Sequence, residues 1–183
     1  PERQVIRDIR VENTSGSGGA IKATLNAFGL LGLDQPGEWS ADLFTDLYFE
    51  RGPALGTRVA WEMENTEGAV FAYGLLADRG VDIFKPGTEL DRDGDARGLL
   101  TFEQRWRLTD EWTLFAEAAF ISDEAFIDAF FEGLGETRRE FTNRLFARRL
   151  SENTSLTVDL RGESSSFLSN EYLLQSQGYS VTK

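Results

Sequence analysis

Apolar and polar side chains alternate along most of this chain with a period of two residues. One such segment carries Trp39, Ala41, Leu43, Leu47 and Phe49 on one side, with Ser40, Asp42, Asp46 and Glu50 on the other. A period of two is typical of a β-strand that has one apolar face and one face in water. The pattern therefore predicts an all-β fold, and we expect functional residues to lie on a sheet.

The same alternation returns in later segments. In one of them the apolar positions oppose charged ones: Leu55, Val59, Trp61 and Met63 against Arg58, Glu62 and Glu64. A second has the same form: Leu100, Phe102, Trp106 and Leu108 against Thr101, Glu103, Arg105 and Arg107. No segment has the periodicity of a long helix. The alternation and its breakers predict strands at residues 5–11, 20–28, 39–50, 55–65, 69–79, 98–109, 112–122, 137–149 and 154–162, with a weaker one after Ser164.

Short and long connections alternate between these predicted strands. Residues 66–68, 110–111 and 151–153 form short turns, whereas 80–97 and 123–136 are long. In an up-and-down meander this places the short turns at one end and the long loops at the other, as in outer-membrane barrels. Residues 52–54 are the exception, because they are short where a long loop is expected. We expect an antiparallel up-and-down meander of about nine or ten strands, a segment of a large outer-membrane β-barrel, forming one incomplete domain over residues 1–183.

The predicted strands are long, and aromatic residues lie at both ends of several of them. Runs of about 10 to 12 residues exceed the usual soluble length of about 5 to 6 and suit a tilted membrane strand. Eight or nine residues at a tilt near 40° span roughly 20 to 23 Å, close to the ~25 Å apolar band of such barrels. We therefore predict a lipid-facing aromatic belt of Trp39, Phe49, Trp61, Trp106, Trp112 and Phe120. The alternative is that these are core aromatics of a soluble barrel or sandwich.

The polar side of the predicted strands is heavily charged. Arg138, Arg144 and Arg148 fall on it, and such residues could form a track along a wet lumen for the phosphate-bearing headgroups of a glycolipid. The alternative, which we favour, is a solvated wall in which arginines pair with acidic residues on neighbouring strands.

Composition excludes several classes of function. The net charge of −12 over 183 residues repels nucleic acid, so no nucleic-acid partner is expected. Histidine and cysteine are absent, which removes Ser-His-Asp and Cys-His catalysis and the usual soft metal ligands. We expect no enzyme activity, catalytic residue, cofactor or metal site. The start at Pro1, without an initiator methionine or signal peptide, indicates an excerpt or a processed product.

Three loop segments have structural interpretations. Asp91, Asp93 and Asp95 resemble a calcium loop, but Ala96 and Phe102 occupy the positions that require Gly and Glu, so an acidic loop in solvent is the better interpretation. Residues 15–19 are expected to form a flexible turn. Residues 126–131 have apolar positions at helical spacing, which predicts a short loop helix packed on the rim, with Ser122 or Asp123 as its N-cap.

The order of several short motifs resembles one family. The sequence Gln-Arg-Trp-Arg-Leu-Thr-Asp-Glu-Trp at 104–112 is followed by Ile-Ser-Asp-Glu-Ala-Phe-Ile-Asp-Ala-Phe-Phe at 121–131, and Tyr-Phe-Glu-Arg-Gly at 48–52 and the segment 73–78 precede them. This arrangement is similar to the barrel of the lipopolysaccharide-assembly outer-membrane protein LptD, also called organic solvent tolerance protein. The resemblance covers roughly residues 39–167, and each motif is short.

The resemblance implies part of a barrel of near 26 strands that receives lipopolysaccharide from the periplasm and releases it into the outer leaflet. It implies lipopolysaccharide or a related glycolipid as cargo, the cell outer membrane as location, an LptE-like plug lipoprotein and an LptA-like periplasmic bridge. Acyl chains would need a lateral opening between strands, expected near residues 5–28. The main alternative is a soluble β-sandwich or lipocalin-like module that binds lipid or carbohydrate. It predicts buried or ligand-facing Trp39, Trp61 and Trp106.

Overall fold

The computed structural model describes residues 4–14, 17–85, 88–123, 125–131 and 141–162, and all of the long elements are strands. The elements in chain order are β1 (Ile6–Thr14), β2 (Gly18–Asn26), α1 (Ala27–Leu30), β3 (Trp39–Tyr48), β4 (Gly52–Met63), β5 (Thr66–Asp78), β6 (Val81–Lys85), β7 (Thr88–Asp91), β8 (Asp95–Arg107), β9 (Trp112–Ile121), α2 (Phe126–Phe130), β10 (Asn143–Ser151) and β11 (Thr154–Gly162).

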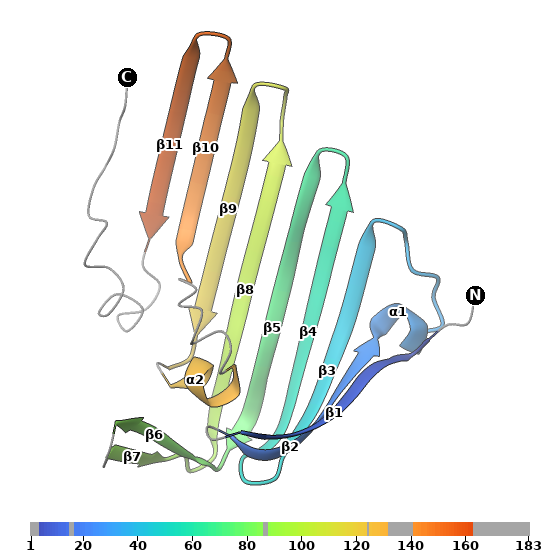
Figure 1. Cartoon of the computed structure of the whole chain (residues 1–183), viewed down its shortest axis with the longest axis vertical. Helices are drawn as coiled ribbons and strands as arrows, with labels where there is room; N and C mark the ends of the chain where they lie inside the picture. Colours follow the sequence, from blue (N-terminus) through green and yellow to red (C-terminus); the bar gives the residue numbers. More distant parts are fainter. Residues whose placement is uncertain (1–3, 15–16, 86–87, 124, 132–140, 163–183) are drawn as a thin grey trace.

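Nine strands form one antiparallel up-and-down sheet. Their order is β1-β2-β3-β4-β5-β8-β9-β10-β11, and β6 and β7 form a separate hairpin between β5 and β8 (Figure 1). The two outer strands, β1 and β11, each pair on one side only within the described part of the chain, so this sheet is open. The expected all-β meander is confirmed.

Strand register separates the side chains by face, because residues that pair across antiparallel strands point to the same side. One face, which we call the apolar face, carries Trp39, Trp61, Gly68 and Gln104 in one continuous row, as the pairing of β3, β4, β5 and β8 shows. The same face includes Ile9, Ile21, Leu47, Leu55, Val70, Leu100, Phe102, Leu114, Leu145 and Leu160. The opposite, polar face includes Lys22, Asp46, Arg58, Glu62, Glu67, Arg105, Glu117, Arg144, Arg148 and Asp159.

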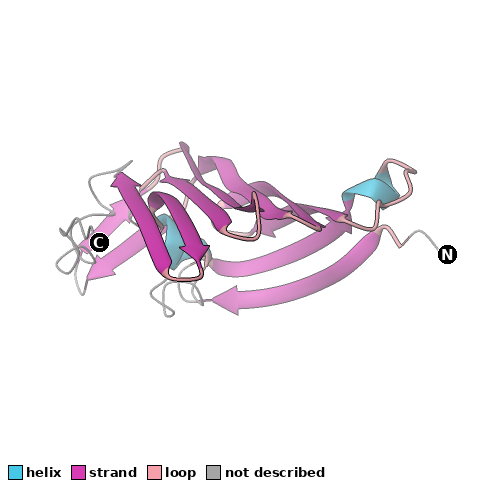
Figure 2. Ribbon diagram, turned by 90° about the horizontal axis from the view of Figure 1, so that it is seen from above, coloured by secondary structure: helices cyan, strands magenta, loops and turns pink. Residues whose placement is uncertain are grey.

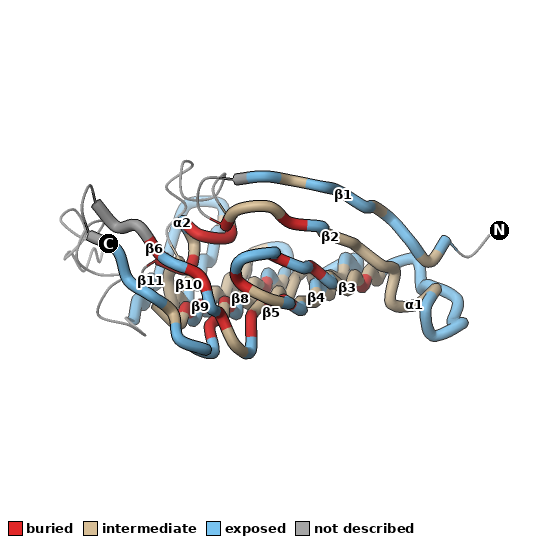
Figure 3. The backbone as a smooth tube through the Cα atoms, turned by 90° about the horizontal axis from the view of Figure 1, so that it is seen from below, coloured by how far each residue is buried: buried red, intermediate tan, exposed pale blue. Residues whose placement is uncertain are grey.

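The sheet is curved, and its buried core lies on the polar face. Figures 2 and 3 show an open trough with α2 inside the curve, between the β1–β2 side and β8–β9. Tyr48, Tyr73, Leu75, Leu99 and Ile121 of the polar face are nearly inaccessible to solvent and pack with α2. The described residues form no second layer over the apolar face, which leaves many of its large side chains exposed. This is the reverse of a soluble sheet, which buries its apolar face.

The two ends of the sheet differ. Residues 64–65, 108–111 and 152–153 form turns at one end, the short-turn end, while 79–94 and 122–142 are long connections at the other, the long-loop end. The exception expected at residues 52–54 is displaced, because 52–54 lie in β4 and the short turn is 49–51. A second exception was not expected: connection 27–38 is long at the short-turn end and contains α1.

Several predicted boundaries are wrong by a few residues. The strand expected to reach Phe28 ends at Asn26, because the Asn26 side chain accepts from the backbone N–H groups of Phe28 and Gly29 and so caps α1. The long loop expected at 80–97 contains the β6–β7 hairpin, whose strands are too short for a clear alternation. Helix α2 exists, but its N-cap position is Ala125 and not Ser122 or Asp123. Residues 137–140 of the predicted 137–149 strand, and the strand after Ser164, lie outside the described residues.

Candidate functional site

All six aromatic residues of the predicted belt lie on the apolar face. Trp39 begins β3, Trp61 lies near the end of β4, Trp106 lies near the end of β8, and Trp112 begins β9. The four tryptophans of the chain therefore gather at the short-turn end. Phe49 and Phe120 lie at the long-loop end and are 63% and 56% exposed. The structure thus places the belt residues in two groups at opposite ends of one face.

The surface between these two groups is exposed and apolar. Leu55 is 62% exposed and Leu100 is 47% exposed, while Trp61 and Leu114 are half-buried by neighbours on the same face. Monomeric soluble proteins rarely expose a contiguous apolar surface larger than a few hundred Å². Larger exposed apolar surfaces mark sites of contact with a membrane, another protein or a ligand.

The amide of Gln104 lies within the apolar face, and it is fully paired. Gln104 is 4% exposed; its Oε1 accepts from Trp61 Nε1 at 3.0 Å, and its Nε2 donates to Thr66 Oγ1 at 2.6 Å. Gly68 makes this possible, because a Cβ there would lie 2.6 Å from the Trp61 ring and 2.7 Å from Gln104 Oε1. The indole can therefore lie against Gly68 with its N–H satisfied, as burial of a polar group requires.

A buried network of arginines and aspartates joins the connections at the long-loop end. Its members are three cations and three anions: Arg51, Arg92, Arg97, Asp78, Asp82 and Asp123. Arg51 follows β3, Asp78 ends β5, Asp82 belongs to β6, Arg92 follows β7, Arg97 belongs to β8 and Asp123 follows β9. The network therefore ties the β6–β7 hairpin and the start of the α2 loop to the sheet.

Arg97 is the centre of this network. Its side chain is 1% exposed and lies 2.5 Å from Asp78, 3.0 Å from Asp82 and 2.6 Å from Asp123. Arg51 makes a second set of bonds to Asp78 at 3.0 Å and Asp82 at 2.9 Å. Each of the six charges in this network thus has an opposite charge within hydrogen-bonding distance, which is the condition under which buried ions are tolerated.

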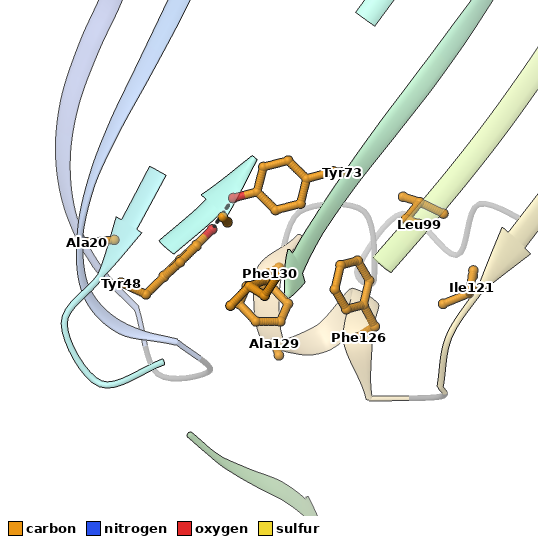
Figure 4. Close-up of a cluster of buried hydrophobic side chains, with 10 residues drawn as sticks. Ala20, Tyr48, Tyr73, Leu99, Ile121, Phe126, Ala129 and Phe130 are labelled. Carbon is orange, nitrogen blue, oxygen red and sulfur yellow. Dashed lines mark hydrogen bonds between the residues drawn. The ribbon is translucent and has the colours of Figure 1, made fainter. Parts of the chain in front are cut away.

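Helix α2 covers the network and the adjoining wall. Phe126 and Phe130 are 0% and 6% exposed, and Arg97 lies over both rings at 5.6 and 5.5 Å from the ring centroids. Phe130 also meets Tyr48 edge to face at 5.1 Å (Figure 4). The expected loop helix is therefore buried inside the curve of the sheet and does not pack on its rim.

Asp123 connects the α2 segment to the sheet electrostatically. Its carboxylate accepts from Arg97, from Arg92 at 3.2 Å and from the Ser122 hydroxyl at 2.8 Å. Burial alone would raise the pKa of Asp123, but the hydrogen bonds from Arg97 and Ser122 outweigh it, so the pKa lies below its usual value. Asp123 is therefore held as an anion at neutral pH.

A second cluster of polar side chains lies on the polar face of the sheet. The Tyr73 hydroxyl donates to Asp46 Oδ2 at 2.5 Å, and the Tyr48 and Tyr73 hydroxyl oxygens are 2.9 Å apart. Lys22 Nζ lies 5.5 Å from the centre of the Tyr48 ring and pairs with Glu12 at 2.8 Å. These groups satisfy one another and form part of the polar wall beside α2.

The three arginines of the predicted headgroup track have different outcomes. Arg138 lies outside the described residues. Arg144 is on the polar face and is bound by Asp159 through two bonds of 2.8 and 3.0 Å. Arg148 is exposed on the same face. A cross-strand pair also joins Arg105 to Glu67 at 2.6 Å, so the described part of this face contains arginine–carboxylate pairs of the kind that the favoured interpretation expects.

No metal site emerges from the described residues. No group of three or more acidic residues there could hold an ion. Asp91, Asp93 and Asp95 are all exposed, and Asp95 pairs with Arg92 at 3.4 Å. Among the described helices, none is both long enough and apolar enough to cross a membrane.

Sequence reasoning missed the Arg–Asp network, because its members look like ordinary loop charges. The apolar patch beneath α2 was not predicted either, although the sequence contains a signal for it. At the long-loop end the alternation breaks into consecutive apolar pairs, Leu75-Leu76, Leu99-Leu100 and Phe120-Ile121. Such pairs place apolar side chains on both faces, so they mark the positions where the polar face is also covered.

Comparisons with known proteins add no family assignment. A scan against protein-family models gives no match for this chain, and a search of curated proteins gives none either.

Proposed function

We propose that this chain forms part of the wall of a β-barrel in the cell outer membrane, and that the barrel moves lipopolysaccharide, or a related glycolipid, into the outer leaflet. The observation that carries the membrane part is the exposed apolar face, bounded by tryptophans at one end and phenylalanines at the other. The lipopolysaccharide part rests on the resemblance of the short motifs to the LptD barrel.

The distance between the two aromatic groups supports a membrane setting. Trp112 and Phe120 are eight residues apart on β9, and Trp39 and Phe49 are ten apart along β3 and its turn. At ~3.3 Å per residue and a tilt near 40°, these separations span ~20 to 25 Å along the membrane normal. An apolar band of ~25 Å between aromatic girdles is usual for outer-membrane barrels.

The polar face supports a wet interior. Its charges pair across strands, as Arg144 does with Asp159, and such pairs persist beside water but not against hydrocarbon. Within the described residues β1 and β11 each pair on one side only, and in this proposal their outer edges pair with further strands, since an unpaired strand edge is costly in a bilayer. The role is steric and electrostatic, with no bond chemistry. In this proposal an LptE-like plug lipoprotein and an LptA-like bridge are the protein partners.

Photo-crosslinking in cells tests the cargo. A photoreactive residue replaces Arg148 on the polar face or Ile9 on the edge strand β1, and a third variant carries it at Asp110 in a short turn. We expect lipopolysaccharide adducts at Arg148 and Ile9 and none at Asp110. The absence of adducts at both of the first two positions would contradict the transport role and leave the membrane location to be judged on its own test.

A further inference from the structure

Connection 27–38 differs from the other connections at the short-turn end. Leu30, Leu31 and Leu33 in it are 51%, 71% and 54% exposed. Residues 27–33 have the sequence Ala-Phe-Gly-Leu-Leu-Gly-Leu, without a charge. The other three connections at this end carry carboxylates at their tips, at Glu64, Asp110 with Glu111, and Glu152, whereas the carboxylates of connection 27–38, Asp34 and Glu38, follow the leucines.

The leucines are presented by a well-defined turn. Asn26 Oδ1 accepts from Phe28 N at 3.1 Å, and Leu33 N donates to Phe28 O at 2.8 Å. Gly32 adopts a φ of 71°, a value that favours glycine and closes the turn after α1. A Cβ on Gly29 would lie 3.2 Å from the Gln4 carbonyl oxygen, so its absence lets α1 rest against the segment that leads into β1.

The turn is continuous with the apolar face on both sides. Leu25 leads into it from β2 and Trp39 follows it in β3, and both belong to that face. Gln35 Nε2 donates to the Trp39 carbonyl at 2.8 Å, and Trp39 N donates to Pro36 O at 3.1 Å. These bonds fix the leucine-bearing loop to the tryptophan end. Figure 1 shows α1 at the end of the row of short turns, beside the β1 edge.

We infer that Leu30, Leu31 and Leu33 form an interfacial lipid anchor, which inserts into the headgroup region of the leaflet that meets the tryptophan end. This inference rests on the proposed membrane location and adds a contact outside the strands. Short uncharged apolar segments beside tryptophans are stabilised at the boundary between headgroups and acyl chains, whereas carboxylates stay in water. The occupant is therefore the phospholipid surface itself.

Site-specific fluorescence tests the anchor. The chain has no cysteine, so Leu31→Cys can carry a single environment-sensitive fluorophore. The labelled chain is reconstituted in vesicles of phosphatidylethanolamine and phosphatidylglycerol that contain a nitroxide close to the headgroup. Leu55→Cys, in the apolar band, reports membrane insertion, and Asp110→Cys, at a polar turn of the same end, is the matched control.

We expect the label at position 31 to emit at shorter wavelength than the label at 110 and to lose several-fold more intensity to the nitroxide. Quenching at 55 with no more quenching at 31 than at 110 overturns the anchor and leaves the proposed membrane location intact. A label at 31 that is shielded from aqueous iodide but not quenched by the nitroxide also overturns it, because protein then covers the leucines. No quenching at 55 overturns both proposals.

Discussion

Replacing Arg97 by methionine should destabilise the chain more than any change to a surface charge. The Arg97 side chain is 1% exposed and contacts three aspartates, two of which are themselves almost fully buried. The substitution converts a balanced network of three cations and three anions into one with an excess negative charge. Removing one member of a buried pair typically costs about 3–5 kcal/mol, because the remaining charge is left without its partner.

Urea unfolding in detergent micelles, followed by tryptophan fluorescence, measures the change. The matched control is Arg105→Met, since Arg105 and Glu67 are 54% and 45% exposed and such a pair contributes about 0–1 kcal/mol. Adding Asp78→Asn to the Arg97→Met variant restores charge balance and should recover part of the lost stability. A loss below about 1 kcal/mol for Arg97→Met, equal to that of the control, would refute the argument that the network holds the long-loop end together.

Three further predictions follow from the same contacts. The pKa of Asp123 is lowered in the folded chain, so its stabilising contribution is present above the unfolded carboxyl pKa of about 4 and is lost as pH falls through the lower folded pKa. Measurements of the unfolding free energy against pH should show this loss in the unchanged chain. The Asp123→Asn variant should lack this component of the pH dependence. Phe130→Ala should cost about 3–5 kcal/mol and expose α2 to limited proteolysis, and an α2 that stays protected would contradict its placement in the core. Leu55→Arg should lower the free energy of unfolding in a bilayer by about 2–4 kcal/mol, whereas Thr157→Arg on the exposed polar side of β11 should lower it little. Equal effects of the two substitutions in folding titrations into vesicles would argue against a lipid-facing Leu55.

The alternation was sufficient to assign the faces of the sheet, because side-chain direction in a strand depends only on local backbone geometry. Trp61 and Arg58, for example, fall on opposite faces as their spacing requires. Strand ends were less predictable, because they depend on local caps such as the Asn26 side chain.

The Arg–Asp network could not be read from the sequence, because it depends on contacts between distant residues. Arg51 and Asp78 are 27 positions apart, and Arg97 and Asp123 are 26 apart. The sequence also did not predict which face of the sheet α2 covers. Its Phe126 and Phe130 have helical spacing, but their burial depends on the curvature of the sheet and on the paired apolar residues at the long-loop end.

Quenching of the native tryptophans by brominated lipid tests the central claim, that the apolar face contacts hydrocarbon. All four tryptophans lie on that face near the short-turn end, so the intact chain needs no label. Reconstituted in vesicles, the chain should lose most of its tryptophan emission when the bromines lie on the acyl chains close to the headgroups, and less when they lie at the bilayer centre. Emission that is unchanged at every bromine depth would contradict the claim and favour a soluble module whose tryptophans are covered by protein.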